Sequence, residues 1–141
     1  MRWVLSASAV LILAGCRGSY EPPAPILTLI PAAMRVAGPS TKVDDHTLCL
    51  MAGGSVEALV HVHRSTATVV LVASSPRQEA VPGFAVQLGA RMSTPTSIRG
   101  PQGEARAYHL DAARGEQVLR VVVSENSPGA LCLQQVVVTQ P

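Results

Sequence analysis

The sequence predicts an all-β domain of sandwich or barrel type, and three observations lead to that class. Short apolar runs of strand length recur along the chain, and many are rich in valine, whose branched side chain suits a pleated strand. Glycine and proline separate these runs at frequent intervals, as turns between strands require. Beyond the first 15 residues, no segment keeps the apolar period of an amphipathic helix.

The start of the chain is typical of an export signal. Met1-Arg2-Trp3 is a short positive segment, an apolar run follows, and Gly15 precedes Cys16. The apolar run is shorter than the roughly 20 residues that a transmembrane helix needs. We therefore expect residues 1–15 to be a signal peptide that the mature chain lacks.

The residues Leu13-Ala14-Gly15-Cys16 resemble the lipobox of bacterial lipoproteins. This resemblance implies cleavage before Cys16, a diacylglycerol thioether on its sulfur and acylation of the new amino terminus. Two or three acyl chains would anchor the protein stably to a membrane of the cell envelope, whereas a single chain binds only marginally. Arg17, in place of Asp, favours the outer membrane, with the domain on its periplasmic or surface face. The alternative is an ordinary secretory signal in which Cys16 stands by chance.

Residues 16–25 are predicted to be a lipidated tether. Their prolines favour extended backbone, which would hold the following domain off the membrane surface. The remaining residues, 26–141, have the length of one domain.

The strands of this domain are expected in the apolar or alternating runs between turn residues. We predict strands at residues 26–30, 47–51, 56–63, 68–73, 85–88, 106–110, 117–124 and 131–139. Many short strands at this spacing indicate a sandwich or a barrel.

Composition excludes some functions. The charges are few and nearly balanced, and the absence of a basic stripe argues against a nucleic-acid partner. The sequence has no GxSxG elbow and no credible Cys/His pair, and its acids are too scattered to nominate a glycosidase pair. We therefore expect a protein that is not an enzyme.

Cys49 and Cys132 are the only cysteines after Cys16. In an oxidising compartment two cysteines are expected to form a disulfide, which would stabilise the fold by ~4–5 kcal/mol in the chain-entropy model. The alternative is a pair of buried free thiols. A zinc site is not predicted, because no CxxC pair is present.

Two groups of residues are possible metal ligands. His61 and His63 share one face of a strand with Glu57 and could hold copper or zinc, or they could simply line a solvent-facing strand edge. Asp44 and Asp45 could contribute to a calcium site, or they could form a solvated turn. We predict no metal cofactor, with calcium left open.

The order of segments after Ile30 carries a family resemblance. It rests on residues 30–34 with Gly38, 48–50, Gly53-Gly54, 69–73, 82–89, 107–110, 118–123, Asn126 and 131–138. This pattern resembles the jelly-roll carbohydrate-binding modules of the xylan-binding, calcium-assisted type. The resemblance implies a jelly-roll β-sandwich of the galactose-binding-like kind.

The chain departs from that family where acids are expected. Pro31 and Ala33 replace the acids that help to hold a structural calcium, Gln134 replaces an acid of the last strand, and Ser127 stands where sugar-binding members tend to carry Asp. Amide and hydroxyl groups supply only neutral oxygens. The resemblance therefore implies a fold that persists after calcium and the usual sugar site are lost, with the disulfide as a replacement clamp between the first and last parts of the sandwich.

The predicted function is non-catalytic binding of a polysaccharide or cell-wall glycan by an envelope lipoprotein. The candidate contacts are Arg77, Gln78, Glu125 and Asn126, with Phe84 as a possible stacking ring. The alternative is a structural lipoprotein that docks an envelope protein, which the scarcity of aromatic residues favours. A metal carrier that uses the two strand histidines is a third hypothesis.

Overall fold

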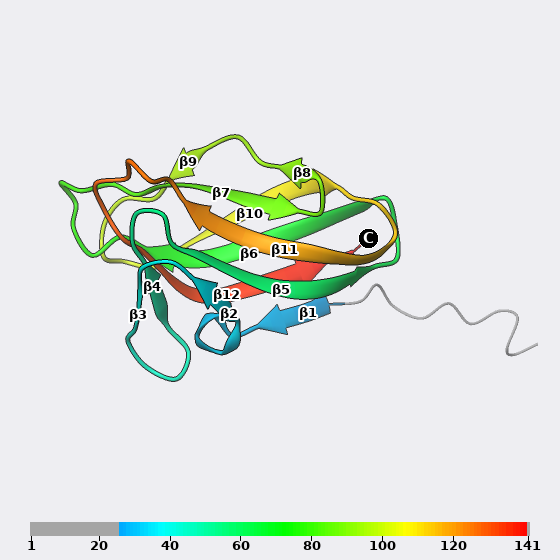
Figure 1. Cartoon of the computed structure of the whole chain (residues 1–141), viewed down its shortest axis with the longest axis horizontal. Coiled ribbons are helices and arrows are strands. Elements are labelled where there is room, and N and C mark those ends of the chain that lie inside the picture. The colour runs from blue at the N-terminus through cyan, green and yellow to red at the C-terminus, as the bar shows by residue number, and fades with distance from the viewer. Residues whose placement is uncertain (1–25, 141) are drawn as a thin grey trace, which may run out of the picture.

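The computed structural model of the chain describes residues 26–140, so the predicted signal peptide, the tether and Cys16 lie outside the described residues. Residues 26–140 form two antiparallel sheets that face each other (Figure 1) and contain no α-helix. The predicted all-β class is therefore confirmed. No helix in this part of the chain is long and apolar enough to cross a membrane.

The first sheet, sheet A, has six strands, and its central strands β6 and β12 are the longest. Its strands in order are β10 (Glu104–Asp111), β6 (Thr66–Ser74), β12 (Leu131–Thr139), β4 (Leu48–Leu50) and β3 (Ser40–Lys42). The strand β1 (Ile26–Leu29) pairs with the second half of β12, and β4 pairs with the first half. β1 is therefore an edge strand over its whole length.

The second sheet, sheet B, has a partly uncovered edge. Its strands in order are β2 (Arg35–Ala37), β5 (Ser55–Val62), β11 (Gly115–Val123), β7 (Gly83–Leu88) and β8 (Arg91–Met92), and β9 (Thr96–Ser97) also pairs with β7. β2 pairs only with residues 55–57 of β5, so the rest of β5 has a strand partner on one side alone.

The eight predicted strands are all present, with ends that differ by at most two residues. The sequence did not predict β2, β3, β8 and β9, because these strands have two or three residues and, unlike β4, no run of three apolar residues. The family resemblance implies an opening strand at residues 30–34, and this expectation is wrong. There the buried Pro31 begins a 3-10 turn, η1 (Pro31–Ala33), closed by a hydrogen bond from the Met34 N–H to the Pro31 carbonyl oxygen.

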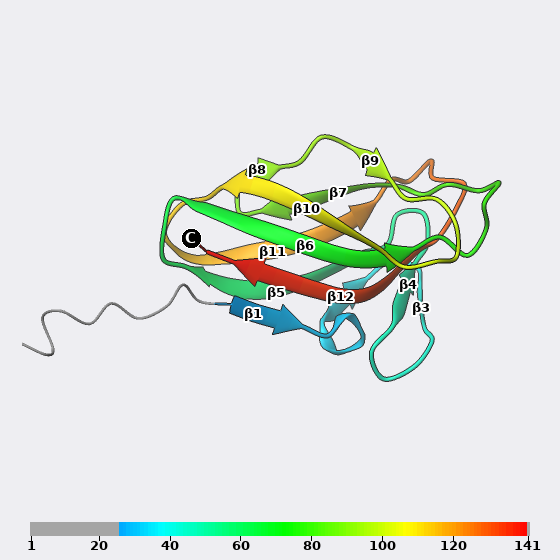
Figure 2. The ribbon, with the colours of Figure 1, turned by 180° about the vertical axis from the view of Figure 1, so that it is seen from behind.

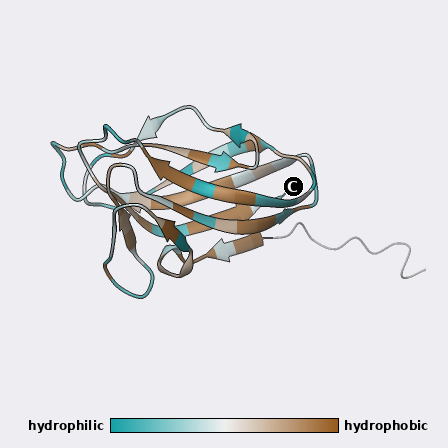
Figure 3. Ribbon diagram, viewed as in Figure 1, coloured by the Kyte–Doolittle hydropathy of each residue, from teal (hydrophilic) through white to brown (hydrophobic). Residues whose placement is uncertain are grey.

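The inward-facing residues of both sheets form one core. In β6 and β11 buried residues alternate with more exposed ones, because successive side chains of a strand point to opposite faces. Polar bands interrupt the largely apolar strands β5 and β11 (Figure 3). The largest fully buried side chains include Phe84, Leu50, Leu71, Leu88, Ile98 and Leu119.

The predicted disulfide between Cys49 and Cys132 is present. The two cysteines are direct cross-strand partners on β4 and β12, so the bond joins neighbouring strands of sheet A. It connects residues 83 positions apart and therefore ties the beginning of the domain to its last strand.

Candidate functional site at the loop end

Four loops gather at one end of the sandwich, which we call the loop end. They are residues 51–54, 75–82, 98–103 and 124–130. The strand register brings them together, since Val123 pairs with Phe84 and Glu104 with Ala73 just before or after these loops. The opposite end holds Ile26, where β1 begins, and the C-terminal residues of β12 (Figures 1 and 2).

Backbone hydrogen bonds connect the loops to one another. The Ser75 N–H donates to the Gly100 carbonyl oxygen at 2.8 Å, and the Gly53 N–H donates to the Val123 carbonyl oxygen at 3.1 Å. The Ser124 N–H donates to the Gly83 carbonyl oxygen at 2.9 Å. These bonds fix the loops as one surface on the rigid sheets.

The buried Ser75 shapes the loop 75–82. Its hydroxyl lies 2.9 Å from the carbonyl oxygen of Arg77 and 3.3 Å from that of Ala80, within hydrogen-bond distance of both. A buried hydroxyl needs such partners. The serine therefore holds the loop curled while the Arg77 side chain stays exposed.

Ser127 has a similar structural role in the loop 124–130. Its hydroxyl accepts a hydrogen bond from the Gly83 N–H at 3.1 Å and donates one to the Gly129 carbonyl oxygen at 3.0 Å. A Cβ on Gly129 would overlap the carbonyl oxygen of Ala80, so the two loops touch through backbone. At the position where the family resemblance implies an acid, this chain uses a hydroxyl to hold its own loops together.

The loops enclose a cavity of about 440 Å³. Arg77 contributes the only ionisable side chain to its lining, and the other residues are apolar or small: Met51, Ala52, Pro76, Ser127, Pro128, Gly129 and Ala130. The sequence did not predict this apolar lining, because its residues come from three loops that only the strand pairing brings together. The cavity can offer hydrogen-bond donors at one side and aliphatic contact at the other.

Four of the five predicted glycan contacts lie at the loop end. Arg77 lines the cavity. The Gln78 side-chain nitrogen lies 3.9 Å from the point where a Cβ on Gly100 would lie. The Glu125 Cγ lies 3.8 Å from the point where a Cβ on Gly53 would lie. Asn126 is exposed in the same loop as Glu125.

The prediction of Phe84 as a stacking ring is wrong. Its side chain is 1 % exposed and belongs to the core between the sheets. The ring meets Tyr108 of the opposite sheet edge-on, with 6.4 Å between centroids. In β7 every second side chain from Phe84 onward is buried between the sheets. The preceding Pro82-Gly83 turn made Phe84 look like a loop residue.

The candidate ligands on β5 do not form a metal centre with Glu57. The rings of His61 and His63 lie side by side, with centroids 4.6 Å apart. The Glu57 carboxylate accepts hydrogen bonds from the Arg120 guanidinium at 2.8 and 3.2 Å. Within residues 26–140 no three of His, Cys, Asp and Glu lie close enough to hold a metal ion.

Asp44 belongs to an exposed turn. Its carboxylate accepts hydrogen bonds from the backbone N–H groups of His46 at 2.8 Å and Thr47 at 2.7 Å. These two bonds favour the charged form and hold the pKa of Asp44 below its usual value. The carboxylate therefore serves the local turn.

Comparison with known proteins shows the fold. No family model matches the chain, and no curated protein matches its sequence. Its structure is similar to a family 36 carbohydrate-binding module of a multidomain xylanase from the hindgut metagenome of Trinervitermes trinervoides, with a TM-score of 0.72, 11% identity, and coverage of 83% of this chain and 98% of that one. It is also similar to a family 36 module solved with calcium and xylotriose, with a TM-score of 0.67, 11% identity, and coverage of 79% and 97%.

A third similar structure is the family 6 module of a laminarinase from Zobellia galactanivorans, with a TM-score of 0.63, 10% identity, and coverage of 82% of this chain and 100% of that one. Enzyme chains also match, but over a fraction of their length, such as 34% for a carbohydrate esterase from Cellvibrio japonicus. The domain therefore has the jelly-roll β-sandwich fold of carbohydrate-binding modules, as the sequence predicted.

Proposed function

We propose that the protein is a non-catalytic, lipid-anchored lipoprotein of the cell envelope that binds a glycan at its loop end. The observation that carries this proposal is the placement of Arg77, Gln78, Glu125 and Asn126 on two loops that touch each other. They stand on a fold shared with carbohydrate-binding modules. A lipid on Cys16 and an outer-membrane address complete the proposal.

The side chains of the loop end suit sugar hydroxyls. Amide and carboxylate groups can each hold two neighbouring hydroxyls, and the Arg77 guanidinium adds several donors. The aliphatic surfaces of Met51 and the two prolines can cover the C–H face of a sugar ring. Both described aromatic rings outside histidine, Phe84 and Tyr108, pack in or against the core, so we expect weak binding without ring stacking.

The arrangement of the two ends supports an anchored binding protein. The described chain begins at Ile26, which pairs with Thr139 at the end opposite the loops. A tether that enters at Ile26 would leave the loop end free to meet a polymer (Figure 1).

A glycan array with calcium and with EDTA tests this function. We would use the chain from residue 17 onward, which contains every described strand, the core and the disulfide. Asn126→Ala, Glu125→Ala and Arg77→Ala should each weaken binding to one polymer class. Glu116→Ala and Arg114→Ala remove the same charges at the opposite end and should leave binding unchanged.

The outcomes separate the candidate functions. Binding that EDTA abolishes would contradict the expected loss of calcium. A folded protein that binds no glycan would favour the second candidate, a lipoprotein that docks an envelope protein, which the absence of a fully exposed Phe, Tyr or Trp ring among residues 26–140 supports. Acyl labelling of the full chain, compared with Cys16→Ser, tests the anchor separately.

A further inference from the structure

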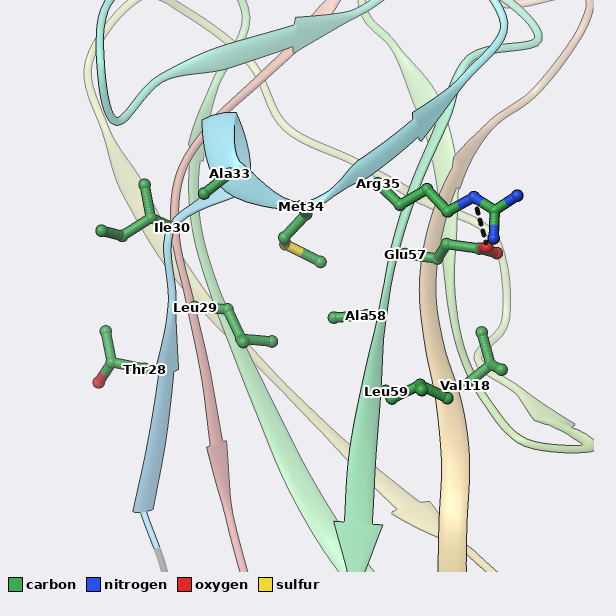
Figure 4. A pocket seen from close by; sticks show the side chains of 10 residues that line it. All are labelled: Thr28, Leu29, Ile30, Ala33, Met34, Arg35, Glu57, Ala58, Leu59 and Val118. Atoms are coloured by element: carbon green, nitrogen blue, oxygen red, sulfur yellow. Dashed lines mark ion pairs between the residues drawn. The ribbon is translucent and has the colours of Figure 1, made fainter.

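The two sheets leave a groove along one side of the sandwich. β1 at the edge of sheet A and the uncovered part of β5 in sheet B face each other across a space of about 620 Å³ (Figure 4). We call this space the seam groove, and its apolar lining includes Leu29, Ile30, Met34, Ala58, Leu59 and Val118. It lies outside the loop end and shares no residue with the cavity there.

The seam groove concentrates exposed apolar side chains. Leu59 is 67% exposed and Ile30 is 42% exposed, and in Figure 4 each side chain lies on the outer side of its own strand, beside the groove. On β1, Leu27 and Ile26 add further exposed apolar surface next to the rim. Scattered exposed leucines are ordinary on a protein surface, but several exposed apolar side chains around one apolar groove indicate an interaction site.

One cation at the end of the groove has unused hydrogen-bonding capacity. Arg35 is 84% exposed and lies 3.8 Å from the Glu57 carboxylate. Arg120 already holds that carboxylate with two shorter hydrogen bonds. The three side chains carry a net positive charge, and Arg35 makes only a long ion pair with Glu57, so its exposed guanidinium can also bind an anionic group.

The seam groove lies close to the proposed anchor. Cys16 precedes Ile26 by ten residues, which can span at most roughly 35 Å. Any surface that carries the acyl chains of Cys16 is therefore within reach of β1.

We propose that the seam groove docks onto the lipid bilayer that carries the anchor. Leu59, Ile30 and Leu27 enter the boundary between headgroups and acyl chains, and Arg35 pairs with a lipid phosphate. The tether by itself predicts a domain held off the membrane surface. The exposed apolar side chains beside the seam groove predict contact with that surface. The inference rests on the proposed anchor at Cys16 but not on glycan binding.

Vesicle sedimentation of the chain from residue 17 onward tests the docking surface without the anchor. The vesicles contain phosphatidylethanolamine with or without phosphatidylglycerol. We expect Leu59→Ser to weaken binding about tenfold and Arg35→Gln to weaken it about fivefold on the anionic vesicles alone. Val118→Ser is a second apolar variant in case Leu59→Ser fails to fold.

The opposite edge of sheet B supplies matched controls. In β8, Met92 is 57% exposed and Arg91 is exposed beside it, so Met92→Ser and Arg91→Gln repeat the two changes away from the groove. Unchanged binding of these controls supports the proposal. Absence of vesicle binding, or equal losses in the β8 variants, would overturn it. Self-association that Leu59→Ser abolishes, without vesicle binding, would instead assign the groove to a second copy of the chain.

Discussion

The side-chain amide of Gln140 donates a hydrogen bond of 2.8 Å to the carbonyl oxygen of His61. Its amide oxygen accepts a second bond of 2.7 Å from the His63 N–H. Gln140 follows the last strand of sheet A, whereas both partners belong to or follow β5 of sheet B. One buried glutamine therefore joins the two sheets at the end opposite the loops, where β5 has no strand partner on that side.

We expect Gln140→Ala to lower the free energy of unfolding by ~2 kcal/mol, since two backbone groups lose their partner in a poorly hydrated place. Urea denaturation of the chain from residue 17 onward measures the change. Gln135→Ala, at an exposed position of β12, is the matched control and should have little effect. Equal losses for the two variants would show that the amide bridge does not stabilise the fold.

Reduction of the disulfide between Cys49 and Cys132 should lower the melting temperature strongly. The bond closes a long loop of the unfolded chain, and its loss should cost ~4–5 kcal/mol in the chain-entropy model. EDTA should leave the melting temperature unchanged, because the expected acidic ligands are replaced by Pro31 and Ala33. A fall on addition of EDTA would show that a metal still supports this sandwich.

The hydroxyl of Tyr108 is buried and makes no hydrogen bond of good geometry among residues 26–140, although the side chains of Thr96 and Arg106 lie near enough to lower its pKa slightly against the larger effect of burial. We expect Tyr108→Phe to raise the stability at pH 7 by ~1 kcal/mol, because it removes a buried group without a partner and keeps the ring contact with Phe84. Tyr108→Leu should destabilise the domain by loss of that contact. A loss of stability in the Phe variant would indicate that the hydroxyl has a partner in solution.

The same residue predicts a loss of stability at high pH. Burial raises the pKa of Tyr108 above its usual value of 10.0, so the folded state favours the neutral phenol. The stability that the neutral Tyr108 phenol contributes is fully present below the pKa that this group has in the unfolded chain. It is lost as the pH rises through the higher pKa of the folded state. Thermal melts between pH 8 and about pH 11 should show a steeper loss for the natural chain than for Tyr108→Phe. Parallel curves would contradict this account.

Gly129→Ala should disturb the loop end. The added Cβ would overlap the carbonyl oxygen of Ala80, so the loops 75–82 and 124–130 must separate. We expect a fall in stability of ~1–3 kcal/mol, typical of forced overpacking, together with weaker glycan binding. Gly83→Ala meets only an ordinary contact with the Ser124 hydroxyl at 3.6 Å and serves as the control. Normal glycan binding by Gly129→Ala would argue against a site formed by these two loops.

The strands and the disulfide could be predicted because their signals are local. Alternating apolar residues in β6 and β11 and the glycine and proline pairs between strands specify elements without reference to distant parts of the chain. The strands β2 and β8 have two or three residues and, unlike β4, no run of three apolar residues, so they carry no such signal. They form because longer neighbours, β5 and β7, offer them unpaired edges.

The placement of the candidate side chains could be predicted only in part. Arg77 and Glu125 lie on loops, and loops reach the surface whatever the sheet order. Phe84 was misplaced because its inward orientation depends on which face of β7 meets sheet A. Glu57 was available as a ligand on its own strand, but pairing of β5 with β11 brings Arg120 directly opposite to it.

The sequence by itself predicted an all-β domain with one disulfide, both of which the structure has, and it predicted a lipoprotein signal before that domain. Those features follow from the order of residues over short distances and from the count of cysteines. Only the tertiary structure decided that four loops meet at one end, that Ser127 is engaged within them, and that β1 and β5 leave an apolar groove. The reason is physical: these features depend on strand pairing and on contact between sheets, which join residues that are far apart in the chain.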